Sequence, residues 1–110
     1  MDEQAKLAEN MRRRKWIANN GKVLRAINML RTKYIALEQL RYALEPNVTL
    51  SELTDSINYL SEIDYISLRN IDSKAETTLA DAEFGELEAK LNENGIRFLA
   101  GKITDDCVGR

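Results

Sequence analysis

The chain contains no histidine and only one cysteine, Cys107. A zinc site built from the usual cysteine and histidine ligands is therefore excluded, and so is a Ser-His-Asp or Cys-His nucleophile. Cys107 has no partner for an internal disulfide and no histidine to activate its thiol. We therefore expect this thiol to have no chemical role.

Long apolar runs are also missing, since none approaches the roughly 20 residues that a membrane span requires. Hydrophobic residues make up 44% and charged residues 31% of the 110 residues, a composition typical of one globular domain. The start, Met1-Asp2-Glu3-Gln4, lacks the basic and apolar regions of a signal peptide. We expect a soluble protein of the cytoplasm, with no membrane partner.

No glycine-rich phosphate loop occurs among the five glycines of the chain. Acidic pairs such as Asp105-Asp106 and Glu86 with Glu88 are of the type that holds metals, but nothing in the sequence fixes them in a pocket. A solvated acidic surface explains them better. We therefore predict a protein that is not an enzyme, without catalytic residues, metal or cofactor.

The net charge of −2 is unevenly distributed. Residues 1–46 contain ten Lys and Arg against five Asp and Glu, whereas residues 47–110 contain six against thirteen. Because phosphate contacts require positive charge, any contact with DNA is predicted to use mainly the N-terminal half.

Residues 48–63 have the pattern of an amphipathic helix, and the rest of the chain is organised around it. Thr49 followed by Glu52 is a capping box that marks the start of this helix. Its predicted buried face consists of Leu50, Leu53, Ile57 and Leu60.

Two helices are predicted before it in the N-terminal part, at residues 2–19 and 22–32, because Asn19-Asn20-Gly21 is typical of a helix end. The core face of the second is predicted to be Val23, Leu24, Ile27 and Leu30. Residues 36–44 form the next predicted helix, which ends at Glu45-Pro46-Asn47 because proline cannot continue a helix. Its inward residues are predicted to be Leu37, Leu40 and Leu44.

Strands are predicted where side chains alternate, at residues 65–71 and 84–91, with a short strand at 33–35. Between the two longer strands, residues 72–82 are predicted to form a long acidic wing tip, with or without one helical turn. A short final helix is expected to begin at Asn92 and to end at Gly101, followed by a loosely held tail.

The order helix, helix, helix, strand, wing, strand resembles the winged-helix superfamily. The segment Lys-Leu-Asn-Glu-Asn-Gly-Ile-Arg-Phe-Leu-Ala-Gly at 90–101 looks like its frequent ending, in which a strand closes with Leu-Thr and a glycine then admits the next helix. Asn92 replaces the usual Thr, and Asp64 stands where many winged helices have Gly. Both replacements are tolerated.

Over about residues 10–106, the chain is most similar to small winged-helix proteins of Mu-like transposable phages and prophages. Those proteins share its length, basic start and leucine-rich centre, and they end in Lys-Leu-Thr-x-x-Gly-Ile. The resemblance implies a bacterial host cytoplasm and a small DNA-binding or regulatory role. It names no catalytic residue.

The predicted fold class is therefore α+β, mainly α: a winged helix-turn-helix with an extra N-terminal helix and a long acidic wing. We divide the chain into an N-terminal basic helix at 1–20, a winged-helix domain at 21–101 and a loose C-terminal tail at 102–110.

Candidate DNA-binding residues come from three places. The basic run consists of four consecutive residues, Arg12 to Lys15, and Lys22 and Arg25 follow it closely. These cations either bind a DNA backbone or an acidic partner, or form a solvated helix face. The central helix offers only polar groups for base edges, and its Asp55 would repel phosphates. In the wing, Arg69 and Lys74 are the only predicted phosphate ligands, the alternative being a solvated surface. The candidates are Arg12, Arg13, Arg14, Lys15, Lys22, Arg25, Ser51, Thr54, Ser56, Asn58, Arg69 and Lys74.

Two functions remain open from the sequence. The first is a phage-encoded accessory or regulatory protein that binds double-stranded DNA mainly through its basic N-terminal half. The alternative is a protein interaction module, in which the acidic central helix and wing bind a phage or host protein and DNA is not contacted.

The N-terminal helix has only a thin apolar stripe, which includes Leu7 and Met11. It is expected either to pair with a second copy in a homodimer or to fold over Val23 and Ile27 in a monomer.

Overall fold

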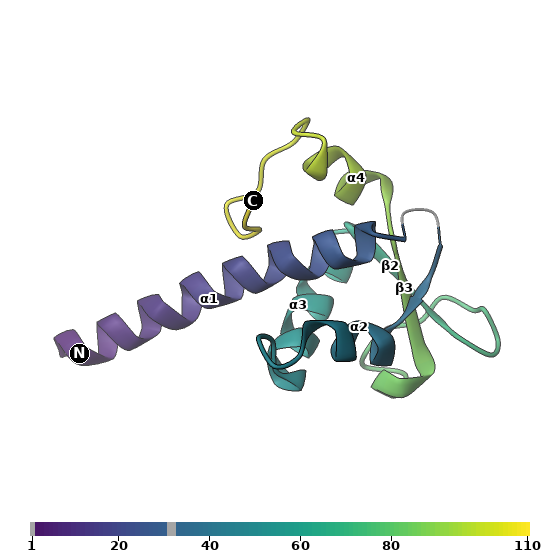
Figure 1. The fold of residues 1–110 in the computed structure, drawn as a ribbon, viewed down its shortest axis with the longest axis horizontal. Coiled ribbons are helices and arrows are strands. Elements are labelled where there is room, and N and C mark those ends of the chain that lie inside the picture. The colour runs from purple at the N-terminus through teal and green to yellow at the C-terminus, as the bar shows by residue number, and fades with distance from the viewer. Residues whose placement is uncertain (1, 31–32) are drawn as a thin grey trace.

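The computed structural model describes residues 2–30 and 33–110, and it has an α+β architecture in which helices predominate. The elements are α1 (Glu3–Asn28), β1 (Ile35–Ala36), α2 (Leu37–Leu44), α3 (Leu50–Glu62), β2 (Ile66–Asn70), the 3-10 turn η1 (Phe84–Glu86), β3 (Leu87–Leu91) and α4 (Glu93–Leu99) (Figure 1). The end of the predicted helix at 22–32 lies partly outside the described residues.

The three strands form one antiparallel sheet in the order β1-β3-β2. Ala89 in the central strand lies opposite both Ile35 and Leu68. Residues 71–83 form the long loop between β2 and β3, and Glu76 in this loop forms a bridge back to Arg69. This loop, which was predicted as the wing and is called the wing below, contains no α-helix, as in the predicted form without a helical turn.

The core lies where α1, α2, α3 and α4 meet the sheet, and the predicted periodicities account for most of it. Its fully buried members include Val23, Leu24, Ile27, Leu37, Leu40, Leu53, Ile57, Leu60, Leu87 and Ala89. Two predicted core residues lie elsewhere, because Leu30 follows the end of α1 and Leu50 is in the first turn of α3. Their exposed fractions are 44% and 39%.

The predicted break at Asn19-Asn20-Gly21 is wrong, because α1 runs through it as one helix of 26 residues. Asn19 and Asn20 are buried where α1 crosses the rest of the molecule, and the side-chain amide of Asn20 donates to the carbonyl oxygen of Cys107 at 2.9 Å. A Cβ on Gly21 would overlap the backbone of Gly109. Asn20 and Gly21 therefore allow the C-terminal tail to pack closely against the side of α1.

The C-terminal tail is not loose as predicted. Val108 is buried, the backbone N–H of Gly109 donates to the carbonyl oxygen of Ile17 at 2.9 Å, and Arg110 donates to the carbonyl oxygen of Phe98 at 3.2 Å. Because α1 runs through the boundary predicted at residue 20 and the tail packs back onto α1 and α4, the described residues do not separate into parts at residue 20 or at residue 101.

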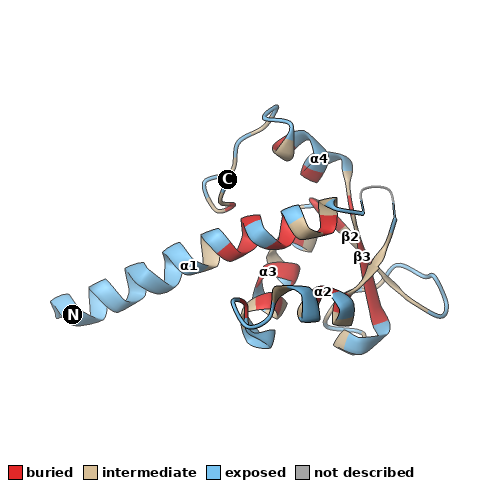
Figure 2. Ribbon diagram, viewed as in Figure 1, coloured by how far each residue is buried: buried red, intermediate tan, exposed pale blue. Residues whose placement is uncertain are grey.

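The first half of α1 projects from this body, with the N-terminus at its far end (Figure 1). Every residue from Asp2 to Lys15 is exposed, while most residues from Asn19 to Ile27 are buried (Figure 2). The molecule is accordingly elongated, with extents of 49 × 32 × 23 Å. The N-terminal half does not fold back over Val23 and Ile27, as one of the two predictions required.

Candidate nucleic-acid interface

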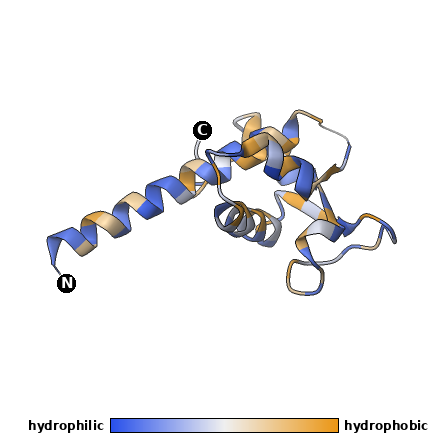
Figure 3. Cartoon of the chain, turned by 60° about the horizontal axis from the view of Figure 1, so that its bottom comes forward, coloured by the Kyte–Doolittle hydropathy of each residue, from blue (hydrophilic) through white to orange (hydrophobic). Residues whose placement is uncertain are grey.

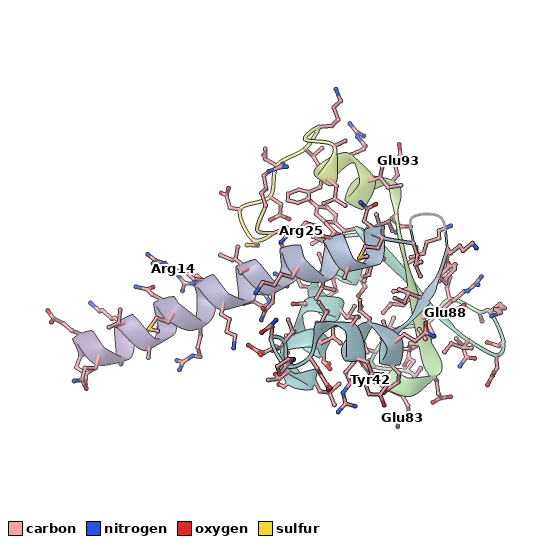
Figure 4. The ribbon with its side chains drawn as sticks, viewed as in Figure 1. Arg14, Arg25, Tyr42, Glu83, Glu88 and Glu93 are labelled. Carbon is pink, nitrogen blue, oxygen red and sulfur yellow. The ribbon has the colours of Figure 1, made fainter. Side chains whose placement is uncertain are left out.

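The basic run of α1 lies on the projecting part of the helix. The side chain of Asp2 caps this helix by accepting a hydrogen bond from the backbone N–H of Ala5 at 2.7 Å. Arg12, Arg13 and Arg14 are exposed, and Arg13 lies 3.8 Å from Glu9 in an exposed pair that contributes little to stability. In the described part of the chain, neither Arg12 nor Arg14 forms an ion pair. Figure 4 shows Arg14 on the projecting part of the helix.

Lys15 differs from the three arginines because it contacts α3. Its Nζ lies 2.9 Å from Oε2 of Glu52, which also accepts a hydrogen bond from the side-chain amide of Asn19 at 3.3 Å. Beside this pair, Trp16 packs edge-on against Tyr59 with 4.8 Å between the ring centroids. Lys15 and Trp16 thus fasten α1 to α3 at the point where α1 leaves the body.

The capping box of α3 is confirmed, and it explains the acidity of Glu52. Thr49 Oγ1 accepts from the Glu52 backbone N–H at 3.2 Å, and Glu52 Oε1 accepts from the Thr49 backbone N–H at 3.0 Å. The hydrogen bond from Thr49 and the one from Lys15 lower the pKa of Glu52 to about 2. Glu52 is therefore a fixed negative charge at the junction of α1 and α3, close to the basic run.

The outward face of α3 carries three of its four predicted base-contacting residues. Ser51 and Asn58 are exposed, and the half-buried Thr54 donates its hydroxyl to the carbonyl oxygen of Leu50 at 2.8 Å. Ser56 is fully buried, so its prediction as a contact to DNA is wrong. Position 56 lies three residues after Leu53 and four before Leu60, which places it within the apolar stripe itself.

Arg69 and Lys74, predicted as phosphate ligands of the wing, both pair with Glu88. The guanidinium of Arg69 lies 3.6 Å from the centroid of the Tyr34 ring and forms an ion pair with Glu88, and Lys74 Nζ lies 3.5 Å from the same carboxylate. Glu88 is buried on β3, so these cations neutralise a carboxylate that would otherwise be costly to bury. They are poor candidates for binding phosphate.

Lys22 and Arg25 are exposed on the second half of α1. At about 100° per residue, they lie on the same side of the helix as Arg14, so the continuous helix carries a row of three cations about 16 Å long. Arg25 also donates to the carbonyl oxygen of Gly109 at 3.0 Å. The row depends on the absence of a break at Gly21.

A groove lies between the end of α3, β2 and the wing, with a volume of about 450 Å³. Three carboxylates line it, from Glu62, Asp64 and Glu76, together with polar groups such as Asn58 and Thr78. None of its described lining residues is Lys or Arg. Asp64 has a φ of 60°, a left-handed conformation that Asp adopts more readily than most residues other than glycine.

The tail adds contacts that the sequence did not reveal. The hydroxyl of Tyr59 donates to Asp105 at 3.2 Å, and burial together with this acidic surrounding raises the pKa of Tyr59 above its ordinary value. Cys107 accepts the hydrogen bond from Asn20 through its backbone carbonyl. Sequence periodicity does not predict the hydrogen bonds of Tyr59 to Asp105 and of Asn20 to Cys107, because each joins residues more than 40 positions apart.

In the parts of the chain that the structure describes, no cluster of three or more cysteine or acidic side chains is placed to hold a metal ion. Within the same residues, every helix is too short or too polar to cross a membrane. Comparison with protein-family models, with curated proteins and with solved structures found no match to this chain.

Proposed function

We propose that this chain is a winged-helix protein of the phage-encoded kind that binds double-stranded DNA through the phosphate backbone, using α1. Support for the winged helix comes from the element order, with β1 before α2 and α3, and β2 joined to β3 by the long loop 71–83. The sheet order β1-β3-β2 is compatible with that architecture. The similarity of residues 90–101 to the ending of such proteins supports the phage setting.

One observation carries the proposal: Arg12, Arg13 and Arg14 are exposed on a helix that projects from the body, with Lys22 and Arg25 further along it. A projecting cationic helix reaches phosphates without interference from the acidic wing. The exposed face of α3 supplies Asp55 and no cation, so binding should depend weakly on base sequence.

The test is a titration of duplex DNA at several salt concentrations, measured by fluorescence anisotropy. With five cations available, the slope of log K against log salt should not be steeper than about −4.5. Replacing Arg12, Arg13 and Arg14 by Ala should flatten the slope by no more than about 2.7, because successive side chains point about 100° apart around the helix, and should weaken binding at least about tenfold at low salt.

The matched control removes three positive charges elsewhere, by replacing Lys33, Arg97 and Lys102 with Ala. These side chains are exposed and lie outside α1. If both triple variants weaken DNA binding equally, the binding depends on the net charge of the protein and not on the cations of α1. An absence of binding by the wild type at low ionic strength would refute the proposal.

The acidic groove between α3 and the wing supports a second candidate function, the docking of a basic protein partner. Its three carboxylates and its lack of described basic lining residues favour an arginine-rich or lysine-rich segment. A lysine-rich peptide should shift the NMR signals of groove residues such as Asn58 and Thr78. Replacing Glu62 and Glu76 with Lys should abolish those shifts, and shifts that persist would remove this candidate.

A further inference from the structure

The projecting part of α1 carries an apolar pair of side chains that none of the described residues covers. Leu7 is 61% exposed and Met11 is 63% exposed, and the two lie one turn apart on the same face of the helix. Figure 3 shows apolar segments between polar ones along this part of α1.

Along residues 3–15 this face points away from the apolar core, and the tail contacts α1 only further along, from Ile17 onward. At about 100° per residue, the direction of Leu7 and Met11 is about half a turn from that of Val23 and Ile27, which face the core. A second helix is therefore able to lie along Leu7 and Met11 without meeting the rest of its own or the neighbouring molecule.

The charges beside the apolar pair make the face complementary to itself. Glu3 in the first turn and Arg14 three turns later lie on the same flank of it. If a second copy runs antiparallel with its Met11 opposite Leu7, each Glu3 lies beside the Arg14 of the other copy. A parallel pair would place the two Glu3 side chains, and likewise the two Arg14 side chains, on opposite edges of the contact, so neither ion pair would form.

We propose that residues 3–15 of α1 pair antiparallel with the same segment of a second copy. Leu7 of each copy packs against Met11 of the other, and two Glu3–Arg14 ion pairs flank this contact. The interface is isologous, as a two-fold dimer requires. It does not depend on DNA binding, because it rests on α1 alone.

The size and position of the segment set the properties of this dimer. A pair of helices of about three to four turns is at the low end of specific interfaces, so association is weak and depends on concentration. Arg12 and Arg13 point to the other side of the helix and stay exposed. The two bodies lie at opposite ends of the helix pair and do not collide.

The test is sedimentation velocity of the full chain, without DNA, over a roughly hundredfold range of concentration. The wild type should shift from monomer towards dimer as the concentration rises. Glu3→Arg alone and Arg14→Glu alone should each raise the dissociation constant at least about tenfold, because each creates two like-charge contacts per dimer. A 1:1 mixture of these two variants should associate like the wild type.

The orientation is tested by the double variant Glu3→Arg with Arg14→Glu, which restores both pairs only in the antiparallel arrangement. The matched control is Arg13→Glu, which makes the same charge change about 100° away around the helix and should leave association unchanged. Circular dichroism checks that each variant keeps its helix. The proposal is overturned if the wild type stays monomeric at every concentration, if the mixture associates no better than either variant alone, or if Arg13→Glu weakens association as much as Arg14→Glu.

Discussion

Gly21 lies in the middle of α1, at the point where the backbone of Gly109 approaches the helix. A side chain at this position would also meet the guanidinium of Arg25, which itself donates to the carbonyl oxygen of Gly109. Glycine is unfavourable inside a helix by about 1 kcal/mol relative to Ala. The close approach of the tail is the physical reason for glycine here.

Gly21→Ala should therefore change stability in opposite directions in two forms of the protein. In the full chain, the new Cβ displaces the tail, and we expect the free energy of unfolding to fall by about 1–2 kcal/mol. In a chain that ends at Lys102, the same change should raise it by about 0.5–1 kcal/mol, since only the helix propensity remains. Chemical denaturation of the four proteins measures both effects, and a gain of stability in the full chain would contradict the docking of the tail on α1.

Arg69 illustrates what a sequence does not reveal about a single charge. Its position on a strand before an acidic loop is compatible with a solvated side chain or with a phosphate ligand. The structure instead stacks it on Tyr34 and pairs it with Glu88, from two other strands or their ends. Partners this far away in the chain are set by strand register, which no local pattern specifies.

At the scale of the element, local patterns were sufficient where one periodicity ran without interruption. The capping box at Thr49, the buried residues Leu53, Ile57 and Leu60 of α3 and the end of α2 at Glu45 are confirmed. The strand predicted at 84–91 begins only at Leu87, after a 3-10 turn, and its predicted alternation is wrong at Glu88, which is buried between Leu87 and Ala89. The error at Gly21 had a different origin. Asn and Gly occur both at helix ends and where another backbone packs closely on a helix, and the sequence around them does not distinguish the two.

The capping hydrogen bond from Thr49 and the contact with Lys15 of α1 should make stability depend on pH through Glu52. Its pKa is about 2 in the folded protein, below its ordinary value of 4.5, so the unfolded chain binds a proton first as the pH falls. The stabilisation is complete above about pH 5 and is lost as the pH falls towards 2. Wild type should therefore lose more unfolding free energy than Glu52→Gln between pH 5 and pH 3, as measured by urea denaturation. Parallel pH profiles of the two proteins would show that Glu52 is not held by Thr49 and Lys15.

At the scale of the whole molecule, the two ends of the chain have opposite relations to the core. The projecting half of α1 was predicted to need an intramolecular or intermolecular partner, and among the described residues it has none before Lys15. The tail was predicted to be loose, yet it buries Val108 and supplies acceptors to α1. Hydropathy did not predict that the tail packs on the core, because one apolar residue in a short polar tail is a weak signal.

Two truncations test this difference between the ends. Removing residues 1–9 should leave the free energy of unfolding of the monomer within about 0.5 kcal/mol of the full chain, because these side chains are exposed. One helical turn remains before Lys15, so fraying of the new end spares the contacts of Lys15 and Trp16. Removing residues 103–110 should lower the free energy by about 1–3 kcal/mol, because Val108 and the acceptors for Asn20 and Arg25 are lost.

Urea denaturation at low protein concentration measures both truncations, so that self-association through α1 contributes little. Amide hydrogen exchange gives an independent check, since loss of the tail should speed exchange near Asn20 and Gly21 while loss of residues 1–9 should not. Equal destabilisation by the two truncations would mean that the N-terminal half of α1 contacts the body. A tail whose removal changes neither stability nor exchange would mean that its hydrogen bonds to α1 do not persist in solution.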